Sequence, residues 1–301
     1  MSSPLTPRQP IVLMVVQPQE RNAPDQRTVE YELFARGVTL LRGTLDEVKE
    51  HARYDAQGRM FFHDCMVGLV YYRSCYTPRD LPTQADVDTV AAIECSLAVK
   101  CPSVGHHLAG TKKIQQVLTD RSVVRRFLDS DEEADAVMRV FMKMYTLDND
   151  ATIDALLTET LAHPEKYVLK PQREGGGNNI WGADIYKTLS AACCCTRRGV
   201  YVLMERICPQ PFEQAMVKEG TVNVLPTLTE LGVFGALLSD GGSRGAQAAA
   251  DYSDASLGQD AAHGVLRNVY MGQLLRTKPV GVDEGGVATG YSVVDTFILM
   301  D

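Results

Sequence analysis

Two unbroken apolar runs in the first third of the chain predict strands of a buried sheet. The runs are Ile11–Val16 and Val67–Tyr72. Runs of this length are typical of parallel strands, because helices cover both of their faces. Each run leads directly into a polar segment, and α/β proteins bind ligands beyond the carboxyl ends of their strands. The pattern therefore predicts a small α/β unit with a ligand site at one edge of its sheet.

Helix and turn signals complete this unit. Residues 26–36 have a helical pattern that Gly37 ends, and Thr44 with Glu47 has the spacing of a capping box. A second helix is predicted to begin at Thr83 and to reach residue 98. The other expected segments are a strand over 39–42 and a hairpin over 59–63.

The pattern changes after residue 105. Helical spacing predicts helices that open at 108–113 and then cover 122–129, 131–145, 153–161 and 183–192. Short β-like runs follow or interrupt them at 167–169, 201–203, 222–228, 232–238 and 265–270, the last three as an antiparallel sheet. The segment 239–264 is rich in Gly, Ala, Ser and Asp, which is the composition of a flexible insertion. The expected class is α/β (α+β), with a disordered tail at 1–10, one domain at 11–105 and another at 106–301.

Composition and charge narrow the function. The chain has 301 residues, of which 45% are hydrophobic and 23% charged, as in a globular protein. A net charge of −8 argues against general binding to nucleic acid or to an anionic membrane surface. The eight cysteines include no C-x-x-C pair, and the N-terminus has no apolar signal core, so we expect a reduced, cytoplasmic protein.

The most informative stretch is the segment of residues 170–179, Lys-Pro-Gln-Arg-Glu-Gly-Gly-Gly-Asn-Asn. Glycines let backbone N–H groups approach an anion closely, and Lys170 adds charge at the end of a strand. Glu174 is suited to Mg²⁺, which prefers carboxylate and phosphate oxygens. The alternative is an ordinary glycine turn, since the order of residues differs from that of a Walker A loop.

Three further features fit a nucleotide site. Lys112 opens a helix and could reach the same phosphates as Lys170, and the segment 203–207 could read an adenine edge through its backbone. These features, together with a second glycine-bearing loop at 281–290, are those of an ATP-grasp ligase. An alternative is that the lysines are ordinary surface charges.

With these motifs, the sequence resembles the eukaryotic glutathione synthetase family. The 170–179 segment is similar to the glycine-rich loop of that family, and other segments match in the same order. These are Glu20-Arg21-Asn22 with Asp25-Gln26-Arg27, Leu108-Ala-Gly-Thr-Lys112-Lys-Ile-Gln-Gln116, Glu230-Leu-Gly, Leu274-Leu-Arg276-Thr-Lys278 and Gly285-Gly-Val287-Ala288-Thr-Gly290.

The resemblance implies a fold, a reaction and a set of site residues. It implies a substrate-binding domain at 11–105 and an ATP-grasp domain at 106–301, with an antiparallel sheet and glycine-rich lid loops. The implied reaction joins γ-glutamylcysteine to glycine with ATP and Mg²⁺, through an acyl phosphate, in a homodimer. The implied ATP contacts are Lys112, Lys170, Pro171, Gln172, Arg173, Glu174, Gly175, Gly176, Gly177, Asn178, Asn179, Trp181, Met204, Glu205, Arg206, Ile207, Glu230, Lys278 and Glu284. The implied substrate contacts are Glu20, Arg21, Asn22, Gln26, Arg73, Ser74, Cys75, Tyr76, Arg276, Val287 and Ala288. Glu174 is the implied metal ligand, and Arg276, Lys278 and Glu174 are the implied catalytic residues.

The resemblance also has departures. Trp181, Arg206 and Glu284 stand where the family has tyrosine, lysine and aspartate, and Ser74-Cys75 replaces a small or acidic pair. The family has a long N-terminal region that supplies two Mg²⁺ ligands, and we expect no equivalent in this chain. The alternative function is therefore an inactive fragment that still binds nucleotide or substrate.

Overall fold

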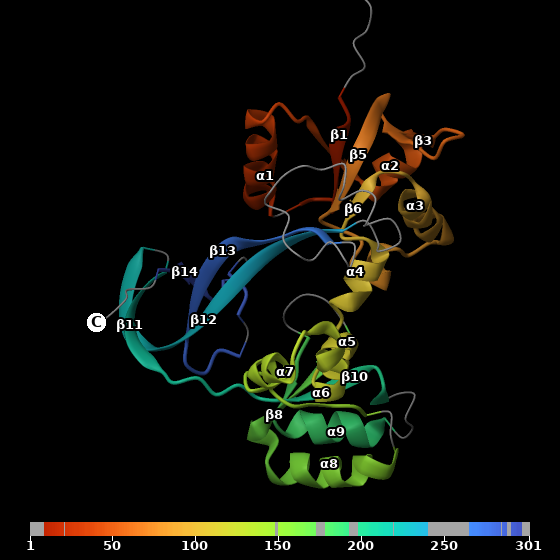
Figure 1. Cartoon of the computed structure of the whole chain (residues 1–301). Coiled ribbons are helices and arrows are strands. Elements are labelled where there is room, and N and C mark those ends of the chain that lie inside the picture. The colour runs from red at the N-terminus through yellow and green to blue at the C-terminus, as the bar shows by residue number, and fades with distance from the viewer. Residues whose placement is uncertain are drawn as a thin grey trace, which may run out of the picture. The chain divides into compact units, whose positions relative to one another are not determined.

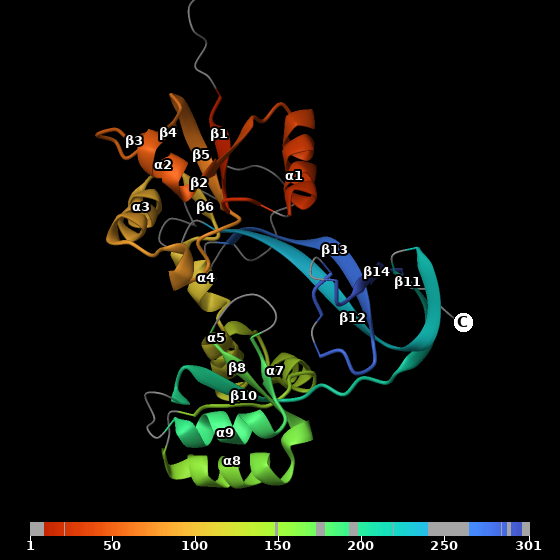
Figure 2. The same cartoon turned by 180° about the vertical axis from the view of Figure 1, so that it is seen from behind.

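The structure is a computed structural model that describes residues 9–20, 22–147, 150–172, 178–192, 198–218, 220–239, 265–283, 285–287 and 290–296. It divides into two compact units, Met1–Ile207 and Cys208–Asp301. The first holds two sheets with their helices, and the second holds one antiparallel sheet (Figures 1 and 2). The predicted boundary at 105/106 therefore lies inside the first unit and stays a prediction.

The first sheet has parallel strands at its centre. β1 (Ile11–Val16) lies between β2 (Leu40–Thr44) and β5 (Cys65–Tyr72), and β6 (Val99–Cys101) continues the parallel part beyond β5. An antiparallel pair, β3 (Ala52–Tyr54) and β4 (Met60–Phe62), extends the sheet from β5. The predicted parallel strands are confirmed.

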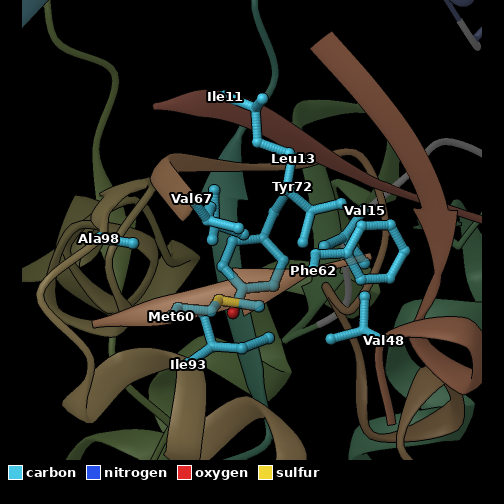
Figure 3. Packing of buried hydrophobic residues seen from close by; sticks show 11 residues of the cluster. Ile11, Leu13, Val15, Val48, Met60, Phe62, Val67, Tyr72, Ile93 and Ala98 are labelled. Atoms are coloured by element: carbon cyan, nitrogen blue, oxygen red, sulfur yellow. The ribbon is translucent and has the colours of Figure 1, made fainter. Parts of the chain in front are cut away.

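Alternating residues of β1 bury both faces of this sheet. Leu13 and Val15 pack with Val48 of α2 (Leu45–His51) and Ile93 of α3 (Gln84–Cys95), as Figure 3 shows. Met14 and its neighbours face α1 (Ala23–Ala35) on the other side. Successive side chains of a strand point to opposite faces, so helices on both sides explain the unbroken apolar run. Figures 1 and 2 show α1 on one side of the sheet and α2 and α3 on the other.

The helix starts were predictable from their caps. The Thr44 hydroxyl accepts a hydrogen bond from the Glu47 N–H at 3.3 Å, and the Glu47 carboxylate accepts one from the Thr44 N–H at 2.7 Å. Thr83 and Asp86 form the same reciprocal cap at the start of α3. Helix α1 begins three residues before the predicted start, because Pro24 favours the first turn of a helix.

The second sheet of the first unit is antiparallel. Its order is β7 (Met144–Tyr145), β10 (Tyr201–Glu205), β8 (Tyr167–Pro171) and β9 (Ile180–Trp181). Helices α8 (Asp150–Ala162) and α9 (Ala183–Ala191) lie side by side on one face, where Leu169 and Leu203 join the core (Figure 1). The remaining helical elements are α4 (Val104–Ala109), α5 (Lys112–Val117), α6 (Arg121–Val124), α7 (Asp131–Met138), η1 (Pro78–Asp80), η2 (Arg125–Phe127) and η3 (Pro164–Lys166).

One helix prediction in this part is wrong. A helix over 131–145 was expected, but α7 ends at Met138, and Met144 and Tyr145 form β7. Tyr145 pairs with Leu203 and Met144 with Met204 at the edge of the sheet. Tertiary pairing therefore overrides the helical spacing of the apolar residues.

The second unit is a four-stranded antiparallel meander. The strands are β11 (Phe212–Lys218), β12 (Thr221–Ser239), β13 (Val265–Pro279) and β14 (Val293–Asp295). β12 is one continuous strand where two were expected, and it forms a long curved ribbon with β13 (Figure 1). The predicted insertion at 239–264 lies outside the described residues apart from Ser239. Across the described residues, no helix combines the length and the apolar character that a membrane span requires.

Candidate functional site

The polar ends of β1 and β5 meet at one edge of the parallel sheet. Arg73 directly follows β5, and its Nη2 lies 2.7 Å from Asp25 Oδ2 in the first turn of α1. The Asn22 side-chain amide donates to the same Asp25 oxygen at 3.1 Å. Because β1 and β5 are parallel neighbours, these polar groups from distant parts of the chain come together.

Glu20 is held by several donors beside this pair. The Asn22 N–H donates to its Oε1 at 2.8 Å, and the Gln26 amide donates to its Oε2 at 2.6 Å. Burial acts to raise the pKa of Glu20, but these hydrogen bonds and the nearby Arg73 charge outweigh it and lower that pKa. Glu20 is therefore an oriented carboxylate at the sheet edge.

The turn after β5 is tightly constrained. Cys75 has a φ of 69°, a left-handed conformation that costs a non-glycine residue about 1–2 kcal/mol. The N–H groups of Tyr76 and Thr77 both donate to Asp80 Oδ2 at 2.9 Å, and the Tyr76 hydroxyl donates to the Tyr72 carbonyl at 2.9 Å. Burial raises the pKa of Cys75 to about 11, so its thiol stays protonated at neutral pH. Ser74 is buried beneath the turn.

The antiparallel sheet of the first unit presents a second set of predicted residues. Lys170 pairs with Val202, and Val168 pairs with both Met204 and Trp181, so Lys170, Trp181 and Met204 share one face. This face is opposite the one that packs against α8 and α9. The strand order thus brings these three predicted nucleotide contacts together.

The segment after β10 is anchored by its own backbone. The Glu205 N–H donates to the Lys143 carbonyl at 2.9 Å, and the Arg206 N–H donates to the Lys166 carbonyl at 2.7 Å. The Arg206 guanidinium lies 5.2 Å from the centre of the Trp181 ring, within the range of a cation–π interaction. The Tyr145 hydroxyl donates to Glu205 Oε1 at 2.7 Å, and burial together with this bond raises the pKa of Tyr145.

A cavity of about 460 Å³ lies within the first unit, beside both sets of residues. Tyr76 and Arg79 line it from the turn after β5, and Gln172 and Asn178 line it from the two ends of the glycine-rich segment. The Gln172 side-chain oxygen accepts a hydrogen bond from the Lys113 N–H at 3.2 Å. Lys112, at the start of α5, is next to that contact, and α5 lies against β10. His107, Leu108, Thr77, Pro78 and Thr111 complete the lining.

The second unit gathers the remaining predicted charges on one face of its ribbon. Glu230 of β12 is directly opposite Arg276 of β13, and the two side chains form an ion pair. Lys278 is two residues along β13 from Arg276, on the same face, and its Nζ donates to the Asp283 carbonyl at 3.0 Å. Val287 lies in a turn in which its carbonyl accepts from the Gly290 N–H at 2.9 Å.

Several predicted site residues lie outside the described residues. These are Arg21, Arg173, Glu174, Gly175, Gly176, Gly177, Glu284 and Ala288. In the part of the chain that the structure describes, no three His, Cys, Asp or Glu side chains are grouped as a metal would need. The Mg²⁺ prediction on Glu174 thus stays a prediction.

Sequence reasoning missed several residues that shape the site. Asp25 pairs with Arg73, Asp80 fixes the turn at Tyr76, and Arg42 reaches into the Glu20 cluster. Asp80 had a readable signal, since Thr77 and Asp80 have the spacing of a capping box. Arg42 had one as well, because it is a charged residue inside an otherwise apolar strand segment.

A family model settles the relationship of the chain. Residues 17–299 match the model described as "Eukaryotic glutathione synthase, ATP binding domain". This chain belongs to the eukaryotic glutathione synthase family. The resemblance predicted from the sequence is therefore confirmed, and with it an ATP-binding family.

Relatives across eukaryotes agree with this family. Glutathione synthetase of Mus musculus is 36% identical over 287 residues, which cover 95% of this chain and 56% of the mouse protein. The chloroplastic glutathione synthetase of Arabidopsis thaliana is 35% identical over 293 residues, which cover 96% of this chain and 50% of the plant protein. The chain thus spans about half of the length of these relatives.

A solved structure supports the fold. A glutathione synthetase-like effector from Globodera pallida, GSS30 in its apo form, has a TM-score of 0.65 and 21% sequence identity over 95% of this chain and 56% of that one. At this identity the likeness concerns the fold alone. It confirms the mixed α/β class of the family member described here.

Proposed function

We propose that this chain takes part in glutathione synthesis as an ADP-forming ligase of γ-glutamylcysteine and glycine. The family supports this proposal, and so does one observation above the others. Glu20, Asn22, Gln26 and Arg73 converge at a single edge of the parallel sheet. A cluster with both an oriented carboxylate and an arginine suits a zwitterionic peptide, since γ-glutamylcysteine carries one ammonium and two carboxylates.

The proposed roles follow from the chemistry of each group. Arg73 would bind a carboxylate of γ-glutamylcysteine, and Glu20 would accept from its ammonium group. Tyr76 would contact the bound peptide between the sheet edge and the cavity. Ser74 and Cys75 would shape the turn that holds Tyr76. Arg276, Val287 and Ala288 are the proposed substrate contacts from the second unit, and Arg21 from the first.

Nucleotide binding is proposed on the antiparallel sheet of the first unit. Because the N–H groups of Glu205 and Arg206 already donate to other carbonyls, adenine would use the Glu205 carbonyl and the Ile207 N–H. Trp181, Met204 and the alkyl part of Arg206 would flank the ring. Lys112, Lys170 and the 171–179 segment would hold the phosphates, with Glu230, Lys278 and Glu284 as further contacts.

The proposed reaction has two steps. A cysteinyl carboxylate oxygen attacks the γ-phosphorus of ATP, and the bond to the ADP oxygen breaks. The glycine amine then attacks the carbonyl carbon of the acyl phosphate, loses a proton, and inorganic phosphate leaves. Negative charge moves between oxygens in both steps, so Lys170, Arg276 and Lys278 would stabilise it. Mg²⁺, proposed on Glu174, would neutralise triphosphate charge when bound.

Phosphate release tests the proposal. The chain is incubated with MgATP, γ-glutamylcysteine and glycine. We expect phosphate release that requires both γ-glutamylcysteine and glycine. Lys170→Met should reduce turnover by about a hundredfold or more, since it removes charge stabilisation from the phosphates. Lys187→Met, an exposed lysine paired with Asp184 on α9, is the matched control and should leave turnover unchanged. Full turnover by Lys170→Met would contradict the proposed role.

A second candidate is binding of nucleotide or substrate without turnover. One observation favours this candidate: the chain covers about half of the length of its relatives. Calorimetric binding of ATP or γ-glutamylcysteine with no phosphate release would select this candidate. A cytoplasmic location and a homodimer are further parts of the proposal, and light scattering would test the dimer.

A further inference from the structure

The Glu20 cluster rests on a buried hydrogen-bonded relay. Gln26, in the first turn of α1, has a fully buried side chain. Its Nε2 donates to Glu20 Oε2 at 2.6 Å, and its Oε1 accepts from Arg42 Nη2 at 2.5 Å. Arg42 lies on β2, beside Met14 of β1. The relay therefore runs from β2, through Gln26 of α1, to Glu20 in the segment that follows β1.

The two ends of the relay fix the orientation of the amide between them. A guanidinium can only donate hydrogen bonds, and a carboxylate can only accept them. The oxygen of Gln26 must therefore face Arg42, and its NH₂ group must face Glu20. If Arg42 were apolar, the buried Gln26 oxygen would lose this donor, and the amide would be held from the Glu20 side alone.

Arg42 lowers the stability of the fold at this position. Its Nε is buried and has no hydrogen-bond partner among the residues that the structure describes. An unsatisfied buried donor costs free energy that an apolar side chain of similar length would avoid. In return, Arg42 anchors the Gln26 amide from its oxygen side, and this second anchor holds the amide in place against Glu20.

We propose that Arg42 is a positioning residue for the peptide substrate, acting on Glu20 through the buried Gln26 amide. This inference rests on the proposed function, because Glu20 is a proposed contact of γ-glutamylcysteine. Arg42 itself does not touch the substrate in this scheme. Arg42 lies outside the sequence motifs that the family resemblance covers.

Substrate binding gives the first test. Calorimetry on the full chain should show that Arg42→Met weakens γ-glutamylcysteine binding about tenfold, which corresponds to about 1.4 kcal/mol. Arg42→Lys retains a donor and should lose less than about threefold. Arg36→Met, an exposed arginine at the end of α1, is the control and should bind as the wild type does.

A double variant separates a positioning role from a merely structural one. If Arg42 acts through Glu20, then Glu20→Gln combined with Arg42→Met should lose no more affinity than Glu20→Gln alone. Turnover, where present, should show the loss in KM and leave kcat within about twofold. Additive losses in the double variant, or wild-type affinity in Arg42→Met, would overturn the inference.

A measurement without substrate keeps this inference distinct from the proposed function. Failure of the wild type to bind γ-glutamylcysteine would count against the proposed function alone. The ¹⁵N side-chain amide signal of Gln26, assigned by its absence in Gln26→Leu, should shift as Glu20 titrates. Arg73 and Tyr76 also act on Glu20, and both are unchanged in the variants. The same titration shift in Arg42→Met and in the wild type would show that Arg42 does not control the amide.

Discussion

The two units hold their candidate charges in different ways. In the first unit, Glu20 and Arg73 are backed by side chains that the fold buries, with Gln26 fully buried behind them. In the second unit, the Glu230 and Arg276 side chains meet across the surface of a ribbon, 60% and 35% exposed. One set of charges is held by buried partners, while the other forms an ion pair exposed to solvent, and we expect the exposed pair to rearrange more readily. A closing part of a site needs such freedom, whereas a part that selects substrate benefits from order.

On the face of the ribbon opposite the exposed pair, hydrogen bonds between side chains join the strands of the second unit. The Thr229 and Thr277 hydroxyls lie 3.0 Å apart on the opposite face, and the Thr277 hydroxyl donates to Asp295 Oδ2 at 2.7 Å. Thr277 is almost fully buried. The ribbon therefore fixes its register from one face and presents solvated charges on the other.

The largest expected effect concerns Arg73. Arg73→Met should weaken γ-glutamylcysteine binding about a hundredfold, because it removes charge-assisted hydrogen bonds to a carboxylate. Stability should change little, since the partner carboxylate of Asp25 is 53% exposed and stays hydrated. Calorimetric titration measures the affinity. Arg53→Met, at a surface ion pair with Asp64, is the control, and equal affinity in both variants would contradict an ordered substrate edge.

The next effect concerns the buried support. Gln26→Leu removes two hydrogen bonds to charged groups and should lower the free energy of unfolding by about 3 kcal/mol. Urea unfolding followed by circular dichroism measures it. Gln84→Leu removes an exposed bond to Asp88 and should change stability by less than about 0.5 kcal/mol. Equal stability of the two variants would mean that the buried Gln26 side chain supports the first unit no more than an exposed surface hydrogen bond does.

Some features of these regions were predictable from the sequence and others were not. The strands β1 and β5 and the caps at Thr44 and Thr83 were predictable, because apolar runs and capping boxes are local signals. The unbroken β12 was not, since the polar residues Thr229 and Glu230 separate two apolar runs until their pairing with Thr277 and Arg276 is known. The hydrogen bond from Arg42 to Gln26 joins residues on separate elements, so no spacing along the chain could predict it.

A smaller effect is expected for the exposed pair of the second unit. Arg276→Met should lower the free energy of unfolding by less than about 1 kcal/mol, because both side chains are solvated and ion pairs of this kind contribute little. Urea unfolding under the conditions used for Gln26→Leu provides the comparison. A loss as large as that of Gln26→Leu would show that the pair is structural rather than free to rearrange.

The smallest expected effect is a proton-linked one in the first unit. Hydrogen bonds from Lys49 and from Thr83 lower the pKa of Asp86 to about 2, from an ordinary value of 3.8. A folded-state pKa below the unfolded one stabilises the fold above about pH 4, and that contribution is lost as the pH falls towards 2. Asp86→Asn should therefore flatten the decline of the thermal midpoint between pH 4 and pH 2. Asp46→Asn is the matched control, since Asp46 bonds the same lysine at 3.0 Å but is 81% exposed. If both variants follow the wild-type pH profile, the carboxylate that joins α2 to α3 is as loosely held as a surface charge, and the order ascribed to the first unit would be confined to the Glu20 cluster.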